Sequence, residues 1–245
     1  MNTSEIKKAN NQWLTSDGTL VRKVCGGRCN IFLISKAGAH ILVDTGMDFM
    51  RRKLIRRLDE MKIENLQYLI LTHTHFDHAA NASAIKDKFN PKVIVHDSEA
   101  AFLLSGDSPL PAGTNTFTRQ LIKTFSNPVR KMARYKPCPV DIHVHEEVDL
   151  SVCGIDARVI HTPGHSPGSV SILIDNEIAL VGDTLIGVLP NKCFPPFADN
   201  VEELIKSWRK LIKFKCTLLL PSHGAPRSLV LLKQNLMARR AMAKV

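Results

Sequence analysis

The sequence has no long apolar run. Hydrophobic residues make up 44% of the 245 residues, yet no stretch approaches the roughly 20 consecutive apolar residues that a membrane-spanning helix requires. The first residues, MNTSEIKKANNQWLTSDG, are polar and lack the apolar centre of a signal peptide. We therefore expect a cytoplasmic protein with no membrane partner. The sequence does not indicate an oligomeric state.

Paired cysteines are also missing. The six cysteines are scattered along the chain, and no C-x-x-C pair occurs. Cys25 and Cys29 are only four residues apart, but the sequence offers them no further partners for a thiolate metal site. Because the chain shows no secretion signal, we expect all six cysteines to be free thiols.

Acidic residues are absent from one long segment. The chain has a formal net charge of +10, and no Asp or Glu occurs between Asp107 and Asp141. Arg130, Lys131 and Arg134 lie in this segment. Its positive charge could attract an anionic small-molecule substrate, while nucleic acid is a less favoured partner that the net charge leaves open. A solvated basic surface without a role is the alternative.

The predicted secondary structure is typical of a layered α/β protein. Short runs of β-branched and large apolar residues predict strands, and apolar residues at helical spacing predict helices. The predicted strands are 19–24, 30–35, 40–44, 66–71, 93–96, 142–150, 155–160, 169–174, 178–181 and 217–221, and the predicted helices follow residue 48 and cover 79–89, 201–214 and 228–243. This order predicts one domain, residues 1–245, with two packed sheets and helices outside.

The segment 98–139 interrupts this order. It contains five prolines, and only its middle has a helical pattern. We expect an inserted helical cap that packs on the sandwich without joining a sheet. Since loops on a rigid scaffold commonly carry specificity, the cap is expected to lie over the functional site and to select the substrate.

The most informative segment is H-T-H-F-D-H, residues 73–78, which directly follows a predicted buried strand. Side chains two residues apart in extended backbone point the same way, so His73 and His75 can bind one metal ion. Asp77 and His78 follow where the chain turns towards a helix, and they can reach a second ion nearby. Imidazole and carboxylate ligands suit zinc and similar divalent ions. The segment therefore predicts a metal site.

Three further ligand-type residues stand in glycine-containing turns after predicted strands. They are His165 in T-P-G-H-S-P-G, Asp183 in G-D-T and His223 in S-H-G. Glycine allows the backbone to approach a crowded centre closely. A single histidine in such a turn is usually a polar loop residue, so these three become candidates only in combination with the segment 73–78.

Together with Asp44 in V-D-T-G, these residues resemble the motifs of the metallo-β-lactamase superfamily, in the family's order and over nearly the whole chain. The resemblance implies an αββα sandwich that holds two divalent metal ions, with zinc favoured and iron or manganese as alternatives. It implies that Asp183 bridges the two ions and that Asp44 orients a ligand through hydrogen bonds. It assigns the remaining ligands as two sets, namely His73, His75 and His165 for one ion, and Asp77, His78 and His223 for the other.

Such a centre predicts a hydrolase. A water molecule between two metal ions loses a proton near neutral pH and becomes the nucleophile, and ions about 3.5–4 Å apart stabilise the attacking and leaving oxygens. Asp77 could also transfer a proton as a catalytic residue. The expected substrate is a small molecule with an ester, thioester or lactone bond, as the resemblance to the glyoxalase II and lactonase branches of the family implies.

Several features limit the resemblance. Asp183 stands where zinc β-lactamases carry Cys or Ser, so lactam hydrolysis is not expected. Little chain follows His223 to form the C-terminal substrate-binding region of glyoxalase II. The lactonases often place a Tyr beside the metal ions, but the two tyrosines of this chain, Tyr68 and Tyr135, lie in a predicted buried strand and in the expected cap. A metal-dependent phosphodiesterase or nuclease of the same fold is the alternative function. His143 and His145 match none of the family's motifs, and we expect them not to bind metal.

Overall fold

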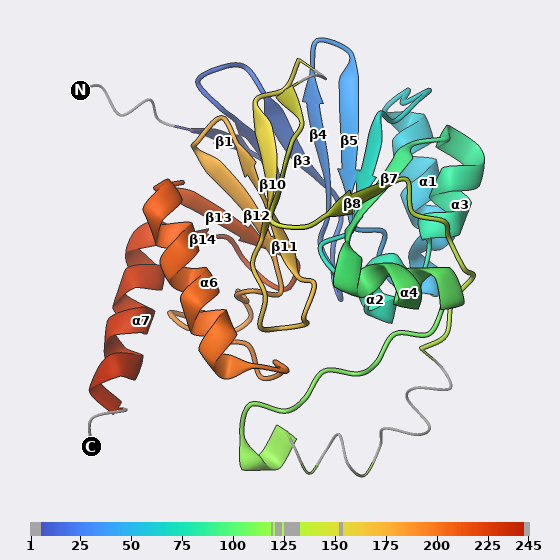
Figure 1. Ribbon diagram of the computed structural model, residues 1–245. Helices are drawn as coiled ribbons and strands as arrows, with labels where there is room; N and C mark the ends of the chain where they lie inside the picture. The colour runs from blue at the N-terminus through green and yellow to red at the C-terminus, as the bar shows by residue number, and fades with distance from the viewer. Residues whose placement is uncertain (1–5, 119, 121–123, 125–132, 152–153, 243–245) are drawn as a thin grey trace.

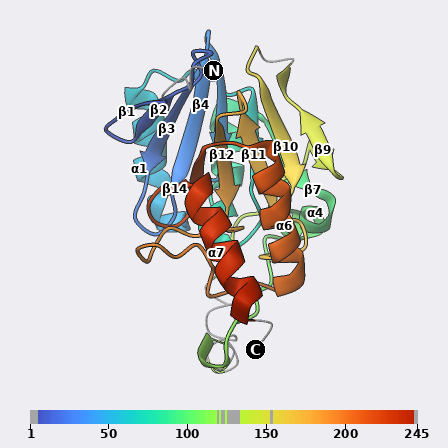
Figure 2. The ribbon, with the colours of Figure 1, turned by 90° about the vertical axis from the view of Figure 1, so that its left-hand side faces the viewer.

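The computed structural model describes residues 6–118, 120, 124, 133–151 and 154–242. Two sheets pack face to face, and helices cover the outer face of each sheet (Figures 1 and 2). This layered αββα arrangement confirms the fold expected from the sequence. In the described part of the chain, every helix is too short or too polar to traverse a bilayer.

The first sheet contains eight strands that follow one another in sequence order. They are β1 (Lys7–Ala9), β2 (Gln12–Leu14), β3 (Leu20–Cys25), β4 (Ile31–Lys36), β5 (Ala39–Val43), β6 (Tyr68–Ile70), β7 (Lys92–His96) and β8 (Ile142–Val144). Pairing is antiparallel from β1 to β5 and parallel from β5 to β8. The carboxyl ends of the parallel strands therefore meet at one edge, which is where ligands bind in open α/β sheets.

The second sheet contains six strands in the order β14-β13-β12-β11-β10-β9. They are β9 (Glu147–Asp149), β10 (Ala157–His161), β11 (Val170–Ile174), β12 (Ile178–Gly182), β13 (Leu218–Pro221) and β14 (Arg227–Ser228). Only β12 and β13 pair in parallel. Helix α6 (Val201–Phe214) connects these two strands, because a parallel pair requires a long crossover.

Two groups of helices form the outer layers. The 3-10 turn η1 (Asp48–Met50) and helices α1 (Arg51–Glu60), α2 (Phe76–Ala79), α3 (Ala82–Phe89) and α4 (Asp97–Ser105) cover the first sheet, whereas α6 and α7 (Leu229–Met242) cover the second (Figure 1). Helix α6 has the bounds that the sequence predicted. The Asn200 side chain caps it by accepting hydrogen bonds from the backbone N–H groups of Glu202 and Glu203, and its apolar face buries Trp208.

The core lies between the sheets and beneath each helix layer. Along the central strands, successive side chains point to opposite faces, so Ile34 and Ile41 face the other sheet while Leu33 and Leu42 face the helices. All four are almost fully buried. Burial of each such side chain contributes about 1.5–3 kcal/mol. Because both faces are covered, these strands read in the sequence as continuous apolar runs.

The single strand predicted for residues 142–150 is wrong. The segment forms β8 in the first sheet and β9 in the second, and the chain crosses between the sheets at residues 145 and 146. Both pieces have the local pattern of strands, so their division depends on which partner strand each one meets. The hairpin of β1 and β2 and the short β14 were not predicted either.

The segment expected to be a cap begins within the sandwich. Helix α4 includes residues 98–105, and its Ala100 and Leu103 are buried in the same core as α1 and α3. The chain then leaves this layer, and residues 106–118 run below the sandwich in Figure 1. Most of the following residues to 132 lie outside the described residues, including Arg130 and Lys131.

Candidate metal centre

The seven expected ligands converge at the carboxyl edge of the strands. His73 and His75 follow β6, and Asp77 and His78 lie on the short helix α2. The second sheet contributes the other three, from loops that follow its strands: His165 after β10, Asp183 after β12 and His223 after β13. The candidate centre therefore lies where the edges of the two sheets meet.

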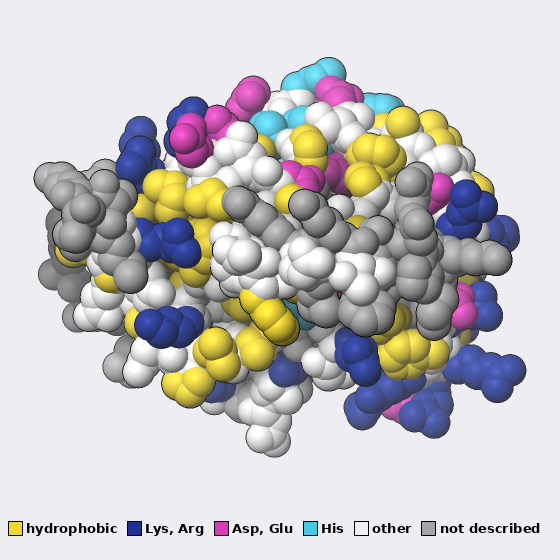
Figure 3. All heavy atoms as spheres, turned by 90° about the horizontal axis from the view of Figure 1, so that it is seen from below, with side chains coloured by type: hydrophobic (Ala, Val, Ile, Leu, Met, Phe, Trp, Pro, Cys, Tyr) yellow, Lys and Arg dark blue, Asp and Glu magenta, His cyan; other side chains and the backbone are white. Residues whose placement is uncertain are grey.

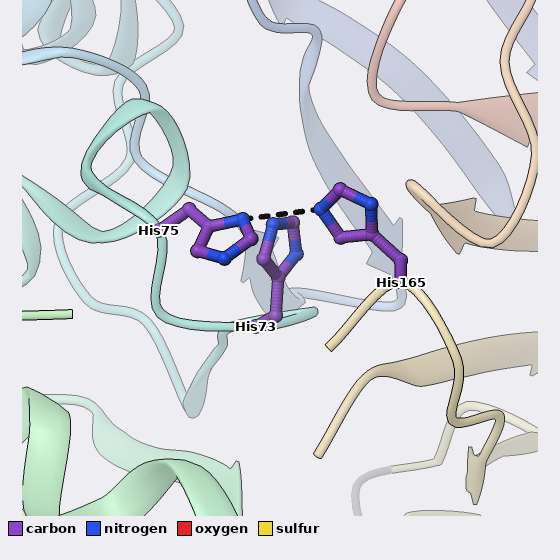
Figure 4. A group of neighbouring side chains, drawn as sticks. All are labelled: His73, His75 and His165. Carbon is purple, nitrogen blue, oxygen red and sulfur yellow. Dashed lines mark hydrogen bonds between the residues drawn. The ribbon is translucent and has the colours of Figure 1, made fainter. Parts of the chain in front are cut away.

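Three imidazoles form the first group. His73, His75 and His165 are buried, and one ring nitrogen from each lies within 4.8 Å of the others. Figure 4 shows the three rings pointing into a common space, with 3.1 Å between His75 Nδ1 and His165 Nε2. The other ring nitrogen of His165, Nδ1, lies 3.0 Å from the carbonyl oxygen of Phe197. A donated hydrogen bond there leaves Nε2 free to act as a ligand.

Asp77, His78 and His223 form the second group, again with ligand atoms within 4.8 Å of one another. Asp77 Oδ2 lies 3.3 Å from His223 Nε2 and 3.8 Å from His78 Nε2. The Asp183 carboxylate contacts both groups: its Oδ2 is 3.3 Å from His223 Nε2 and 3.6 Å from His165 Nε2. Its position is therefore suited to a bridging ligand.

Several atoms of this cluster are buried without a hydrogen-bond partner. Within the described part of the chain, His73 Nε2, His78 Nε2 and Asp183 Oδ1 are all in this condition. An unsatisfied buried polar group costs about 1–3 kcal/mol, so such groups are rarely left without a partner. The orphaned nitrogens and oxygen are donors of the kind that divalent metal ions accept. The residues present therefore fit a metal centre.

Asp44 holds His78 in its orientation. Its Oδ2 lies 2.9 Å from His78 Nδ1 and accepts a hydrogen bond from the Ser222 hydroxyl, also at 2.9 Å. Its Oδ1 accepts the backbone N–H of Thr72 at 2.8 Å. With Nδ1 engaged in this way, His78 directs Nε2 towards Asp77 and Asp183. The resemblance assigned Asp44 an orienting role, and the structure places its carboxylate within hydrogen-bond distance of His78.

A third group, Cys29 with Asp44 and His78, is also compact enough to suggest a metal site. The chemistry argues against it. His78 Nδ1 is already engaged by Asp44, and burial raises the pKa of the Cys29 thiol to about 12. A protonated thiol is a poor metal ligand, because the thiolate is the binding form.

The electrostatics differ between the two groups. Burial lowers the pKa of His73, and burial together with His165 lowers the pKa of His75 to about 3, so both imidazoles are neutral. Burial also disfavours the charged form of His223, but the Asp183 carboxylate outweighs it and raises the pKa of His223 to about 10. His78 and His223 outweigh the burial of Asp77 and hold its pKa at about 2. The three-histidine group can therefore bind a cation without losing a proton at His73 or His75, whereas the second group must first lose the proton of His223.

A cavity of about 420 Å³ opens over the candidate ligands. Besides the ligands, its described lining consists entirely of apolar side chains, namely Phe76, Leu110, Pro111, Ile186, Val188, Pro195, Pro196 and Phe197. Among the described side chains that are visible in Figure 3, most Lys and Arg lie towards the rim of this face. Sequence reasoning missed this lining, because apolar loop residues carry no pattern that separates them from the core.

The remaining candidates lie elsewhere. His143 and His145 both contact the Asp97 carboxylate at the surface, with 2.9 Å between His143 Nδ1 and Asp97 Oδ1. Arg134 donates a hydrogen bond to Asp107 at 3.2 Å, and its side chain is 70% exposed. Neither the two histidines nor Arg134 is among the described residues that line the cavity.

Comparisons with known proteins agree with this geometry. Residues 26–223 match the family model of the metallo-beta-lactamase superfamily. A probable metallo-hydrolase from Methanocaldococcus jannaschii is 28% identical over 193 residues, which cover 76% of this chain and 82% of the relative. A hydroxyacylglutathione hydrolase from Haemophilus influenzae is 28% identical over 188 residues, which cover 75% and 79%.

Solved structures show the same fold. An archaeal metallo-beta-lactamase superfamily protein from Sulfolobus tokodaii superposes with a TM-score of 0.66 at 18% sequence identity, covering 89% of this chain and 85% of the other. The matched segment 26–223 spans most of the chain and contains all seven candidate ligands and Asp44. The chain therefore belongs to the metallo-beta-lactamase superfamily of metal-dependent hydrolases.

Proposed function

We propose that this protein hydrolyses an ester, thioester or lactone bond at a centre of two divalent metal ions, with zinc as the favoured metal. The observation that carries the proposal is the position of Asp183. Its carboxylate lies within 3.8 Å of ring nitrogens from both ligand groups, and its Oδ1 is buried without a hydrogen-bond partner among the described residues. One carboxylate that reaches both groups supports two ions close together.

In this proposal the ligand residues have different roles. When bound, the two ions would activate water and polarise the bond to be cleaved. His73, His75 and His165 would hold one ion as neutral imidazoles, and Asp183 would keep the two sets together. The Asp77 side chain lines the cavity and is 23% exposed, so it is the carboxylate best placed to accept a proton from water and return it to the leaving group.

The wall of the cavity is held in place by backbone contacts. The segment that contains Leu110 and Pro111 is fastened to the loop before α6: Thr114 N–H donates to the Pro196 carbonyl at 3.0 Å, and Ala198 N–H donates to the Ala112 carbonyl at 2.8 Å. A third bond joins the backbone N–H of Ala112 to the Asp199 carboxylate at 2.8 Å. The apolar lining is therefore part of the framework, so the site offers a preformed apolar pocket.

This lining favours a substrate with an apolar acyl or alkyl group. An anionic group on the substrate, away from the metal ions, would need a Lys or Arg as its partner, and neither is among the described lining residues. Burying an unpaired charge in apolar surroundings is costly. The relative named as a hydroxyacylglutathione hydrolase also supports hydrolysis of an acyl compound. That the basic residues between Asp107 and Asp141 attract the substrate to the site stays a separate prediction.

Metal analysis combined with a substrate panel tests the proposal. Protein prepared in excess zinc should contain about two ions per chain, because seven ligands are more than one tetrahedral zinc requires. It should hydrolyse apolar aryl esters, thioesters or lactones faster than bis-aryl phosphodiesters. A stoichiometry that stays at one ion would contradict the two-metal centre, and faster phosphodiester cleavage would favour the nuclease class.

A further inference from the structure

Glu99 is a buried carboxylate outside the expected ligand set. It lies on α4 and is only 1% exposed. Its Oε2 accepts hydrogen bonds from the backbone N–H of Thr74, at 3.0 Å, and from the Thr74 hydroxyl. Its Oε1 accepts the Ser166 hydroxyl at 2.6 Å and the backbone N–H of Gly168 at 3.1 Å. Four donors from two loops therefore share one carboxylate.

Both loops carry ligands of the three-histidine group. Thr74 stands between His73 and His75 in the chain, and Ser166 directly follows His165. The first loop extends from one sheet and the second from the other, and the backbone N–H of Val170, just after the second loop, donates to the Thr72 carbonyl oxygen, just before His73, at 2.8 Å. Glu99 connects them at a point adjacent to the ligands themselves.

Two further contacts tighten this connection. A Cβ atom added to Gly168 would lie 2.4 Å from Glu99 Cγ, so the loop backbone rests directly against the glutamate stem. The Tyr135 hydroxyl also donates to the Thr74 carbonyl oxygen at 2.7 Å. The backbone N–H and carbonyl of the residue between the two histidines are thus both engaged.

We propose that Glu99 is a positioning residue that sets the separation of these two loops, and thereby the affinity of the three-histidine group for its metal ion. The inference rests on the metal centre proposed above, but it holds whichever bond the enzyme cleaves. Burying a carboxylate costs several kcal/mol unless hydrogen bonds compensate, and here all four compensating donors come from the two ligand loops.

The second ligand group has supports other than Glu99. Asp44 orients His78, and the His223 carbonyl oxygen accepts the backbone N–H of Gly187 at 2.7 Å. A change at Glu99 should therefore weaken one group and spare the other. General loss of folding, in contrast, would weaken both groups together.

Glu99→Gln is the sharpest substitution because it keeps the shape of the side chain. A carboxylate offers only acceptors, whereas a carboxamide presents one NH₂ donor. Each carboxylate oxygen of Glu99 accepts a backbone N–H, from Thr74 or from Gly168. Whichever way the amide is turned, its NH₂ group meets one of these N–H donors, and one loop is released.

The experiment measures zinc affinity in metal-free protein by competition with a chromophoric chelator. In a His223→Ala background, the remaining tight zinc-binding step measures the affinity of the three-histidine group. Glu99→Gln should lower this affinity at least about tenfold, which is the lower end of the effect seen when a residue that orients a metal ligand is replaced. In a His165→Ala background, the remaining zinc-binding step measures the affinity of the second group, which Glu99→Gln should leave unchanged. Glu60→Gln, at an exposed position on α1, is the matched control.

The outcomes separate this inference from the proposed function. If the unsubstituted protein binds fewer than two zinc ions, the two-metal centre fails. If it binds two, but Glu99→Gln changes neither step or weakens both equally, the positioning role is wrong. If Glu99→Gln does not fold, Gly168→Ala replaces it, because the added methyl group would collide with Glu99 Cγ and shift the carboxylate away from its donors. It should give the same selective loss, and unchanged affinities would overturn the inference.

Discussion

The apolar cavity predicts a steep dependence of activity on acyl-chain length. Its volume of about 420 Å³ lies within the range of small-molecule pockets, about 300–1,000 Å³, and its described walls contribute polar groups only through the candidate ligands. Each methylene group moved from water into such a cavity contributes about 0.8 kcal/mol, or about fourfold in kcat/KM. Hexanoyl esters should therefore exceed acetyl esters by roughly 200-fold, because they bury four additional methylene groups.

The assay is a series of aryl esters or thioesters that share one leaving group and differ only in the acyl chain. Ile186→Ala removes part of the cavity wall and should lower the increment per methylene, with little effect on the acetyl ester. Val230→Ala, at a 63% exposed position on α7 that is outside the described lining, is the matched control.

A pair of acyl groups of equal length tests the charge argument. An acyl chain that ends in a carboxylate should be hydrolysed more slowly than the uncharged chain, because the described lining offers no Lys or Arg to pair with it. A flat dependence on chain length, or a preference for the anionic acyl group, would refute the apolar-substrate reasoning. The second result would instead support the basic segment as a substrate guide.

Three further predictions concern the ligands and a buried thiol. Asp183→Ala should abolish hydrolysis and reduce the bound metal, whereas His143→Ala should leave both unchanged in rate and metal assays; equal losses would contradict the ligand assignment. The Asp183 carboxylate outweighs burial and raises the pKa of His223 to about 10, so the metal-free imidazole keeps its proton as pH rises from 7 towards that value. Zinc must displace this proton to bind His223. The apparent affinity of the second group for zinc should therefore rise by up to about tenfold for each pH unit, and His223→Ala should remove this pH dependence. Burial raises the pKa of Cys29 to about 12, so iodoacetamide at pH 8 should modify it only after unfolding, as peptide mass spectrometry can test.

The sequence alone determined the family, the αββα layers and the candidate ligands. Each of these depends on local pattern. The buried strands are continuous apolar runs, α6 carries both its cap at Asn200 and its apolar face in the sequence, and four ligand-type residues lie between residues 73 and 78. The structure brings the seven expected ligands together at one edge of the sandwich. That they hold two metal ions stays a prediction.

Only the tertiary structure decided the features that depend on contacts between distant segments. The division of residues 142–150 between two sheets follows from the partner that each short strand meets. The placement of residues 98–105 in the sandwich follows from the packing of α4, because its pattern alone does not distinguish it from a cap. Glu99 has no motif that identifies it, since its four donors come from positions 25 to 69 residues away. The cavity lining likewise consists of apolar residues from separate loops, and its function becomes visible only when folding places those residues over the ligands.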